Sequence, residues 1–468
     1  MSSKRPSSRF SSPDRGRRSS RAAGAGAASA SIDLRRLHPL DAARLGEIAV
    51  TFARHGVMIV VRRGPVIVLQ PRRRTPRAMA VAIRRSLADL GPTFIKLGQL
   101  IASSPGLFPA TLSDELRKLL DDVPAEPLAD VRRIIELDLG HKVRHLFRSF
   151  DNEPIAPASI AQVHRAVLHD GTVVAVKIRR PRLRRVIERD LRLLALLASA
   201  LERMGPLGTI VNPRAIVDDF AETLRAELDF RNEAVAMERF ETNLRAFGDN
   251  SRVLVPAPVA GMVSRRVLVM TFVDGITIDA VDHLRAQGHD LEDVLRRAIR
   301  AWVEAALVHG HFHGDVHAGN LFVTPSGEVA MLDFGIVGHL DERARDVLRE
   351  TLPALLIERD FERTVRAVFE LGIVQRPIDV SAASRDLEAL VTPLLARGLA
   401  DIDYAEVLGQ VLRVASRYGV RLPKELVLVV KQLLYFERYG KALAPDYAVL
   451  ADPQILLHLV GSLTAPQR

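Results

Sequence analysis

The alternation of apolar and polar residues predicts a chain that is helical at both ends and mixed in its middle. From about 40 to 123 the spacing is mostly helical, and in AMAVAIRRSLADLGPTFIKLGQLIASS apolar residues recur on one helical face. These residues are Leu90, Phe94, Leu97 and Ile101. The stretch SPGLFPATL interrupts the pattern, and we expect a new helix that begins with Ser113 as its N-cap.

The middle of the chain, from 126 to about 275, mixes strand and helix. Residues 160–178 read as a hairpin, because apolar QVHRAVL is followed by a turn at HDG and then by TVVAVKI. Lys177 lies near the end of the second strand. A strand pair of this kind can carry a lysine to the phosphates of a bound nucleotide.

Two long helical runs follow the hairpin, over 182–204 and 213–244. The second run begins with a proline, which suits the first turn of a helix. Two short β-rich pieces, RVLVPAPV and RRVLVMTFV, come next and end at an Asp-Gly pair. From 276 onward the chain is again largely helical, except for the β-rich patch NLFVTPSGEVAMLDFG.

The segment HGDVHAGNLFVTPSGEVAMLDFG carries the strongest chemical signal. Asp315 is followed five positions later by Asn320, and Asp333 opens an Asp-Phe-Gly triplet. In phosphotransferases with this layout the first aspartate faces the attacking hydroxyl or water, while the other two residues hold Mg²⁺. Hard oxygen ligands of this kind suit Mg²⁺. Each residue alone would read as a turn residue, but the order and spacing favour a catalytic site.

Two histidines in the same segment, His313 and His317, raise the alternative of a zinc site. The chain has no cysteine that could join them as a ligand. We therefore favour histidines that orient the backbone of the loop over histidines that bind a metal. The absence of cysteine also excludes disulfides and cysteine nucleophiles, and a reducing compartment is the simpler expectation.

Lys177 is the candidate for a phosphate-facing ammonium. A buried lysine needs a carboxylate partner to stay charged, and the segment AELDFRNEA offers Glu227, Asp229 and Glu233. A continuous helix would display 229 and 233 on one face and 227 on another, and glutamate reaches farther than aspartate. We therefore assign Glu233 to Lys177; the alternative is that these acids form a solvated helix face.

With these motifs the chain resembles the UbiB-like (aarF-type) atypical kinases, which have a protein-kinase-like fold, over about residues 80–450. The motifs that carry the resemblance are KLGQ, PASIAQVH, ELD, GDVHAGN and DFG. The resemblance implies an α+β, bilobal fold with a small β-containing N-lobe, a mostly helical C-lobe and an N-terminal helical extension that covers the active site.

The same resemblance suggests four parts along the chain. They are a disordered basic tail over 1–37, the helical extension with the Lys-x-Gly-Gln motif over 38–125, the N-lobe over 126–275 and the C-lobe over 276–468. Many relatives carry spanning helices at the C-terminus, but the segment LLHLVGSLTAPQR is too short and polar to span a membrane.

The motif PASIAQVH resembles the alanine-rich loop that replaces the glycine-rich loop of ordinary kinases in this family. The resemblance implies nucleotide contacts by Ala158, Ser159, Ala161 and Val163. Glycine lets backbone amides crowd a phosphate, whereas alanine adds a methyl group and restricts φ, so we expect this loop to grip phosphates differently. Pro157 departs from the family pattern, stiffens the loop and removes one amide donor.

The Lys-x-Gly-Gln and Glu-x-Asp motifs are expected to regulate the site. By analogy with the family, Lys96 and Gln99 lie one helical turn apart and face Glu227 and Asp229. They would occupy the groove in which an ordinary kinase binds a peptide, which disfavours a conventional protein kinase. The alternative for Lys96 is a surface lysine that extends its charge into water.

The resemblance implies an enzyme that binds ATP or ADP with Mg²⁺ and acts as an ATPase or as a kinase of small molecules or lipids. Such an activity would support isoprenoid-quinone (ubiquinone or menaquinone) biosynthesis or lipid homeostasis. Expected partners are quinone-precursor lipids and enzymes of the same pathway. Two alternatives stay open: a nucleotide-switched, non-catalytic scaffold for a membrane-associated pathway, and a small-molecule phosphotransferase.

Charge and hydropathy bear on location. The net charge is +10, and the basic stretch 54–85 can rest on an anionic membrane, where one cation contributes about 1 kcal/mol. No segment reaches the ~18 apolar residues of a spanning helix, and no signal-peptide core is present. We expect a cytoplasmic protein, peripheral on the inner membrane face. Its tail fits a disordered arm better than a transit peptide, and nucleic-acid binding is disfavoured because aromatic residues are not interleaved there.

Overall fold

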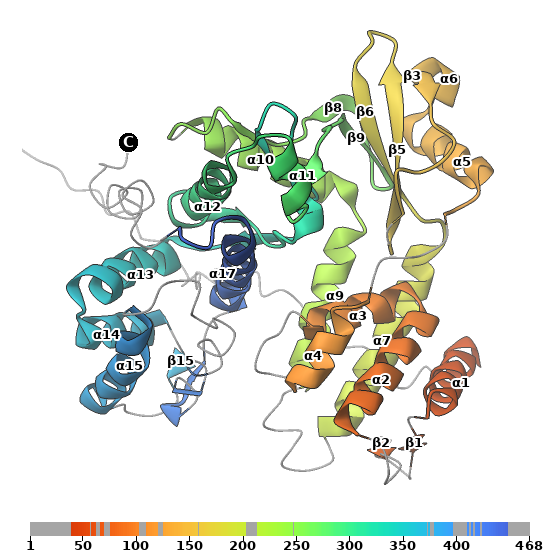
Figure 1. The fold of residues 1–468 in the computed structure, drawn as a ribbon. Coiled ribbons are helices and arrows are strands. Elements are labelled where there is room, and N and C mark those ends of the chain that lie inside the picture. The colour runs from red at the N-terminus through yellow and green to blue at the C-terminus, as the bar shows by residue number, and fades with distance from the viewer. Residues whose placement is uncertain are drawn as a thin grey trace, which may run out of the picture. The chain divides into compact units, whose positions relative to one another are not determined.

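The computed structural model is an α+β fold, and Figure 1 shows its course. It describes residues 39–56, 58–61, 66–69, 75–102, 109–119, 125–157, 159–202, 213–246, 248–371, 373–374, 379–395, 410, 413–414, 417–421 and 424–447. These residues belong to one compact unit that starts at His38. The tail over 1–37 lies outside the described residues, so its predicted character stays a prediction.

The first part of this unit is a helical extension with one small hairpin. Its elements are α1 (Pro39–Arg54), β1 (Met58–Val61), β2 (Val66–Leu69), α2 (Pro76–Leu90), α3 (Pro92–Ala102) and α4 (Ala110–Leu116). The antiparallel β1–β2 pair was missed by the sequence pattern, which read this region as mostly helical. The two apolar runs, VMIVV and VIVL, are only five and four residues long, a length typical of strands rather than helices.

Two helix boundaries in the extension differ from the predicted ones. The periodic stretch around Leu90 and Phe94 is two helices, because Gly91 has φ +91° and Pro92 then starts α3. A periodic apolar face does not reveal such a break when the register continues across it. Ser113 is not an N-cap: α4 begins three residues earlier, at Ala110, and Ser113 lies inside it.

A small lobe follows, built on an antiparallel sheet in the order β3-β5-β6-β9-β8 with β4 beside β5. The strands are β3 (Phe147–Phe150), β4 (Ala156–Pro157), β5 (Ala161–Leu168), β6 (Val173–Arg179), β8 (Pro258–Val263) and β9 (Val267–Thr271). The predicted hairpin is thus confirmed as β5–β6. Helices α5 (Leu128–Leu139) and α6 (Val143–Leu146) accompany the sheet, and α5 buries Val131, Ile134 and Ile135 against it.

Three helices connect the small lobe to the rest: α7 (Leu183–Glu202), α9 (Pro213–Glu227) and α10 (Phe230–Ala246). The predicted run over 213–244 is therefore not one helix. It breaks at Leu228 and Asp229, and the Asp229 carboxylate accepts a hydrogen bond from the Arg231 backbone N–H at 3.2 Å at the start of α10. Aspartate suits such a position because its side chain satisfies an otherwise unpaired amide of the first turn.

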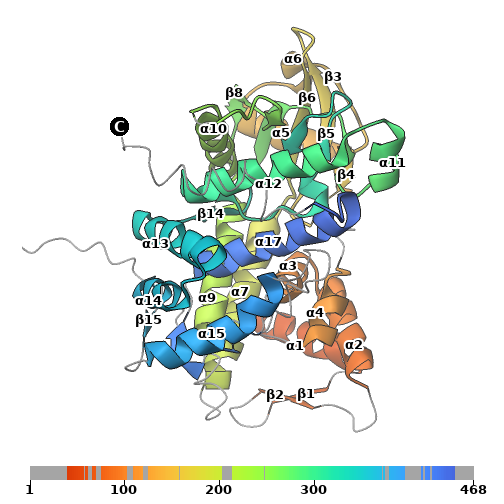
Figure 2. The ribbon, with the colours of Figure 1, turned by 60° about the vertical axis from the view of Figure 1, so that its left-hand side comes forward.

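The large lobe is mostly helical and carries several short strands. Its helices are α11 (Val281–Ala286), α12 (Leu291–Leu307), η1 (Ala318–Asn320), α13 (Glu342–Pro353), η2 (Ala354–Glu358), α14 (Phe361–Leu371), α15 (Val380–Leu395) and α17 (Lys424–Leu443). Its strands are β7 (Val253–Leu254), β10 (Ile276–Thr277), β11 (His311–His313), β12 (Leu321–Val323), β13 (Val329–Met331), β14 (Val337–His339), β15 (Ile373–Val374) and β16 (Val420–Arg421). The two views in Figures 1 and 2 show α17 beside α12, and the two helices are in contact.

The β-rich piece RVLVPAPV is divided between the two lobes. Its start, β7, pairs in parallel with β13 of the large lobe, whereas its end contributes to β8 of the small sheet. This crossing of the chain ties the lobes together beside the predicted catalytic segment, because β13 precedes Asp333.

The main hydrophobic core runs through the extension, α7–α10 and the large lobe. Ile48, Leu90 and Phe94 of the extension belong to the same cluster as Leu191 of α7 and Trp302 of α12. A second, smaller core lies between α5 and the small sheet. The extension is therefore packed as part of the kinase-like body. Among the described residues, no helix is both long and apolar enough to cross a membrane.

Candidate nucleotide-binding and phosphotransfer site

Lys177 is the centre of an ion-pair network in which Lys177 and Glu233 are buried and the Asp333 side chain is half exposed. On β6 it lies opposite Val163 of β5, and its Nζ donates to Glu233 Oε1 at 2.8 Å and Oε2 at 3.0 Å. The same Nζ lies 3.0 Å from Asp333 Oδ1. The structure thus brings Lys177 and Glu233 together as the sequence predicts, although the premise was wrong because the helix breaks between 227 and 233.

The pKa values of the three groups in this network are shifted in different ways. Burial lowers the pKa of Lys177, but Asp333 and Glu233 outweigh burial, so the pKa is raised and the ammonium stays charged. Burial, together with the charge of Asp333, raises the pKa of Glu233 to about 7 despite Lys177. The pKa of Asp333 is lowered, since Lys177 and Lys96 overcome the effect of burial. One ammonium shared by two carboxylates accounts for this difference.

The loop that carries Asp315 is held from several sides. The Asp315 backbone N–H donates to His313 Nδ1 at 3.1 Å, and His313 Nε2 lies 2.8 Å from the Leu332 carbonyl. His313 must then carry its proton on Nε2, because Nδ1 accepts. The Trp302 indole N–H donates to the His313 carbonyl at 2.8 Å. His313 therefore orients backbone, as the sequence favours.

Asn320 and Asp333 approach each other across β12 and β13. The Leu332 N–H donates to the Asn320 carbonyl at 2.8 Å, and Asn320 Nδ2 donates to the Asp315 carbonyl at 2.9 Å. Because the amide nitrogen is used in this way, the Asn320 Oδ1 is left as an acceptor. Together with the Asp333 carboxylate it offers the hard oxygen donors that suit Mg²⁺.

Asp333 also has an unusual backbone conformation, with φ +56°. Left-handed backbone is uncommon outside glycine, although aspartate tolerates it better than most residues. The conformation is fixed by a hydrogen bond from the Gly335 N–H to Asp333 Oδ1 at 3.2 Å. Strained aspartates of this kind cluster at functional sites.

The alanine-rich loop is only partly described. Ala158 lies outside the described residues, while Ser159 and Ala161 are buried. Ala161 is the first residue of β5 and Val163 pairs with Ala156 of β4, so β4 lies beside β5 on the edge opposite to β6 and Lys177. The predicted nucleotide contacts of this loop stay predictions.

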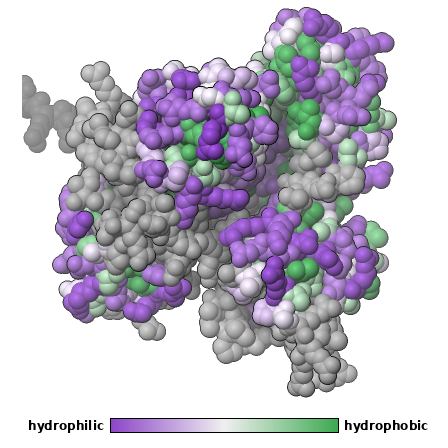
Figure 3. Space-filling view, in the orientation of Figure 1, coloured by the Kyte–Doolittle hydropathy of each residue, from purple (hydrophilic) through white to green (hydrophobic). Residues whose placement is uncertain are grey.

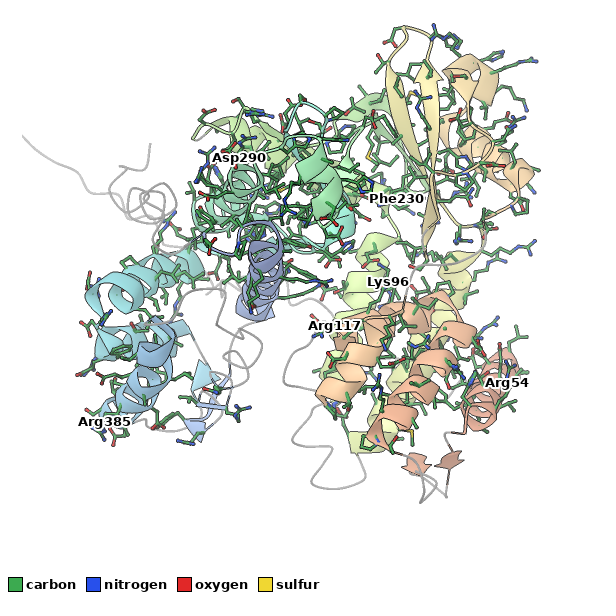
Figure 4. All side chains as sticks on the ribbon, viewed as in Figure 1. Arg54, Lys96, Arg117, Phe230, Asp290 and Arg385 are labelled. Carbon is green, nitrogen blue, oxygen red and sulfur yellow. The ribbon has the colours of Figure 1, made fainter. Side chains whose placement is uncertain are left out.

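Lys96 reaches the kinase-like body from the extension. Its Nζ lies 3.1 Å from Glu227 Oε2, and Figure 4 shows Lys96 where α3 meets α9. Burial raises the pKa of Glu227, and Lys96 opposes this rise. Gln99 Nε2 donates to the Leu119 carbonyl at 3.4 Å, within the extension.

The sequence predicts that Asp229, like Glu227, faces Lys96 and Gln99. In the structure Asp229 binds arginine side chains instead. Its carboxylate binds the Arg231 guanidinium at 2.6 Å and lies 3.5 Å from that of Arg265. The helix break explains the difference, because it turns Asp229 into the first turn of α10 and away from the face of Glu227. The Lys-x-Gly-Gln and Glu-x-Asp motifs therefore meet through Lys96 and Glu227.

Comparison with known proteins identifies the family of the chain. The family model described as "ABC1 atypical kinase-like domain" matches residues 118–368, and the one described as "UbiB helical domain" matches 387–448. The chain belongs to the ABC1/UbiB atypical kinase family. The first match covers more than half of the chain and includes Lys177, Glu233, Asp315, Asn320 and Asp333.

Relatives of this atypical kinase occur in bacteria and plants. The chain is 40% identical over 420 residues to "Uncharacterized protein Rv0647c" of Mycobacterium tuberculosis. This alignment covers 89% of the chain and 84% of the relative. The chain is 32% identical over 398 residues to "Uncharacterized aarF domain-containing protein kinase At5g05200, chloroplastic" of Arabidopsis thaliana, covering 80% and 73%. A solved structure titled "The complex structure of Rv3197-erythromycin from Mycobacterium tuberculosis" aligns over 77% of this chain and 94% of that chain, with 23% identity and a TM-score of 0.49.

Three residues that contact the Asp315 loop were missed by the sequence pattern, and all three lie on α17 within the match to the UbiB helical domain. Lys431 Nζ lies 2.9 Å from Asp315 Oδ1. Gln432 donates through Nε2 to the Gly314 carbonyl at 2.7 Å and accepts at Oε1 from the Val316 N–H at 2.9 Å. The Tyr439 hydroxyl donates to the Val316 carbonyl at 2.9 Å. One sequence signal existed: Gln432 interrupts an apolar face formed by Leu428, Phe436 and Leu443.

Proposed function

We propose that the chain binds ATP with Mg²⁺ and transfers the terminal phosphoryl group to a hydroxyl or to water. The observation that carries this proposal is the contact of Lys177 with both Glu233 and Asp333, next to the loop that holds Asp315. This is the set of groups that phosphotransferases of this type place around a triphosphate.

Each group has a separate task in this proposal. Lys177 donates hydrogen bonds to the nucleotide phosphates, and Glu233 keeps its ammonium in place. Asp315 accepts the proton of the attacking hydroxyl. Asn320 and Asp333 would hold Mg²⁺, which neutralises charge that develops on the phosphoryl oxygens.

A small or lipid-like acceptor fits this site better than a peptide. The ion pair between Lys96 and Glu227 fixes α3 of the extension beside the site, and the extension shares its core with the large lobe. A role in isoprenoid-quinone biosynthesis or lipid homeostasis is supported by family resemblance. Quinone precursors reside in membranes, so we propose peripheral attachment of the chain to an anionic surface.

The hydropathy of the surface bears on how such attachment would work. In Figure 3 the coloured residues of the visible face are mostly hydrophilic, and the hydrophobic ones lie in small groups. Binding through these coloured residues would have to be electrostatic, and it would weaken with added salt.

The deciding experiment is steady-state ATP hydrolysis by the full chain, with and without anionic liposomes and phenolic quinone-precursor analogues. We expect stimulation by both additives and loss of turnover in Asp315→Asn and Asp333→Asn. Equal rates in wild type and both variants would end the enzyme proposal. Retained ATP binding with no turnover would instead favour a nucleotide-switched scaffold.

A cellular measurement tests the quinone role separately. The organism that encodes the chain should lose isoprenoid quinone when the chain is deleted, and wild type but not Asp333→Asn should restore it. Normal quinone levels in the deletion strain, together with altered lipids, would move the role to lipid homeostasis.

A further inference from the structure

Lys431 occupies an unexpected position for a residue so late in the chain. Its Nζ lies 2.9 Å from Asp315 Oδ1, its side chain is only 14% exposed, and the Tyr435 ring lies 5.8 Å from the same nitrogen. Among the residues that the structure describes, the other basic groups near Asp315 are His317, at 3.8 Å, and His313, which is not charged in its hydrogen-bonded form. The permanent positive charge at Asp315 is therefore supplied by α17.

The backbone around Asp315 is attached to the same helix. Gln432 bonds the peptide groups of Gly314 and Val316, which flank Asp315, and its side chain is fully buried. Because neighbouring residues of α17 fix both the carboxylate and the peptides beside it, Lys431 cannot move far from the site without disturbing the loop.

An ion pair at this place conflicts with the proposed task of Asp315. A carboxylate that accepts a proton from the attacking hydroxyl needs that hydroxyl at about 2.6–3.2 Å, whereas one oxygen of Asp315 already accepts from Lys431. When a triphosphate binds, it brings new negative charge within reach, since the attacked phosphorus lies about 3–3.5 Å from the attacking oxygen. A flexible lysine stem can then exchange one anion for the other.

We propose that Lys431 is a catalytic residue that pairs with Asp315 in the resting enzyme and with the terminal phosphoryl oxygens of bound ATP during transfer. This inference rests on the proposed function and extends it, because it makes the UbiB helical domain part of the catalytic centre. In the transfer step the acceptor oxygen forms a bond to the terminal phosphorus while the bond from that phosphorus to the bridging oxygen breaks. The bond electrons leave with ADP, and the acceptor proton passes to Asp315.

The test measures nucleotide binding to the full chain, in a variant that cannot hydrolyse ATP. Asp315→Asn removes the competing carboxylate charge, so Lys431 should be available to the nucleotide. Adding Lys431→Met should weaken ATP binding by about ten- to a hundredfold, the effect of one charge-assisted hydrogen bond, and leave ADP binding unchanged. Calorimetric titration with Mg-ATP and Mg-ADP measures both.

Conservative and matched variants separate catalysis from structure. Lys431→Arg should retain most of the preference for ATP over ADP, because it keeps the charge. Lys441→Met removes a lysine from the same helix that pairs with Glu437, and it should leave both affinities unchanged. In the otherwise native chain, Lys431→Met should lower kcat about a hundredfold with a smaller change in KM.

Three outcomes decide between these possibilities. If Lys431→Met weakens ATP and ADP equally, or neither, Lys431 only neutralises Asp315 and the proposal is overturned while the proposed function stands. If the wild-type chain binds no nucleotide at millimolar concentration, the proposed function itself fails. A loss confined to ATP supports the assignment even if no acceptor is known.

Discussion

Lysine–carboxylate pairs organise the site at the level of single residues. Three such pairs join different parts of the chain: Lys177 with Glu233 and Asp333, Lys96 with Glu227, and Lys431 with Asp315. In each pair at least one partner is largely buried, so that removing one member leaves a charge in a poor solvent. The strength of each pair can therefore be measured by substituting one member and then both.

The pair between Lys96 and Glu227 gives the clearest stability prediction. Lys96→Met should lower the free energy of unfolding by about 3 kcal/mol, the low end for a broken buried pair, because Glu227 can take up a proton. Adding Glu227→Gln should restore most of the loss. Urea unfolding of the two single variants and the double variant measures the coupling, and additive losses would contradict a direct pair.

The site was predictable where residue type and spacing act together. Asp315, Asn320 and Asp333 lie in one short segment, so their order in the sequence already implies their proximity. Lys431 lies 116 positions from Asp315 on an amphipathic helix, where a lysine reads as an ordinary surface residue. No local pattern indicates which helix a distant loop will contact, and for this reason the third pair emerged only in the structure.

At the scale of elements, the β11–β14 pair shows how closely the core beside the catalytic loop is packed. Gly338 lies directly opposite Phe312, and a Cβ at that glycine would overlap the Phe312 ring. The ring cannot move aside easily, because it is fully buried and lies 5.3 Å from the Trp302 ring. The glycine is thus required by contact rather than by backbone conformation.

Gly338→Ala should therefore destabilise the fold by about 1–3 kcal/mol through overpacking. Gly46→Ala is the matched control, since Gly46 lies in α1 with no atom within 4 Å of a new Cβ. That control should stabilise by up to about 1 kcal/mol, because alanine favours helix. Thermal and urea unfolding measure both, and an equal response would show that the Phe312 contact is unimportant.

One carboxylate adds polar contacts to the hydrophobic packing of α5 on the small sheet. Asp138 accepts from the Ser264 hydroxyl at 2.8 Å and from Arg266 Nε at 3.0 Å, in the turn between β8 and β9. Burial alone would raise the pKa of Asp138, but Arg266 and Ser264 outweigh burial and hold it below its ordinary value of 3.8.

A carboxyl group with a lowered pKa stabilises the fold above its unfolded pKa and loses this effect as the pH falls through its folded pKa. Asp138→Asn should therefore destabilise at pH 6 and progressively less below pH 4, where the wild-type carboxyl also becomes neutral. Asp282→Asn, at a fully exposed side chain, is the control for the loss of a surface carboxylate. Urea unfolding at several pH values is the measurement, and parallel pH curves for wild type and Asp138→Asn would refute the assignment.

Elements were predictable where the apolar pattern and the turn signal agree. The β5–β6 hairpin has both, with Gly171 at φ +94° in its turn, and it forms as predicted. The break after α2 was missed because an apolar face continues in register on both sides of it. The break after α9 was missed because apolar residues recur at helical spacing in both α9 and α10. Hydrophobic periodicity reports which residues face the core and is insensitive to a one-residue reversal of the backbone between two helices.

At the scale of the whole unit, the continuity of the main core decides what the extension does. Apolar residues of α1–α3 pack in the same cluster as those of α7, α9 and α12. Removing the extension would expose one side of this cluster to water. The extension is therefore required for the stability of the kinase-like body, besides placing Lys96 at the site.

Deletion of residues 1–102 should accordingly give an aggregated or dye-binding chain rather than an unregulated kinase. Deletion of 1–37 is the control, because it leaves every described residue in place. Gel filtration, binding of a hydrophobic dye and cooperativity of unfolding measure the outcome. A soluble, cooperatively folding product of the larger deletion, with new activity toward peptides, would mean that the extension is a removable cover.

The two hydrogen bonds of Gln432 have a consequence for protein synthesis. The ribosome makes the loop around Asp315 long before it makes the residue that fastens this loop. Domains fold in order as they emerge, so a nascent chain can complete its small lobe while the loop still lacks its anchor. A message cut short between codons 335 and 432 would then yield a polypeptide with every motif of a kinase and an unfastened catalytic loop.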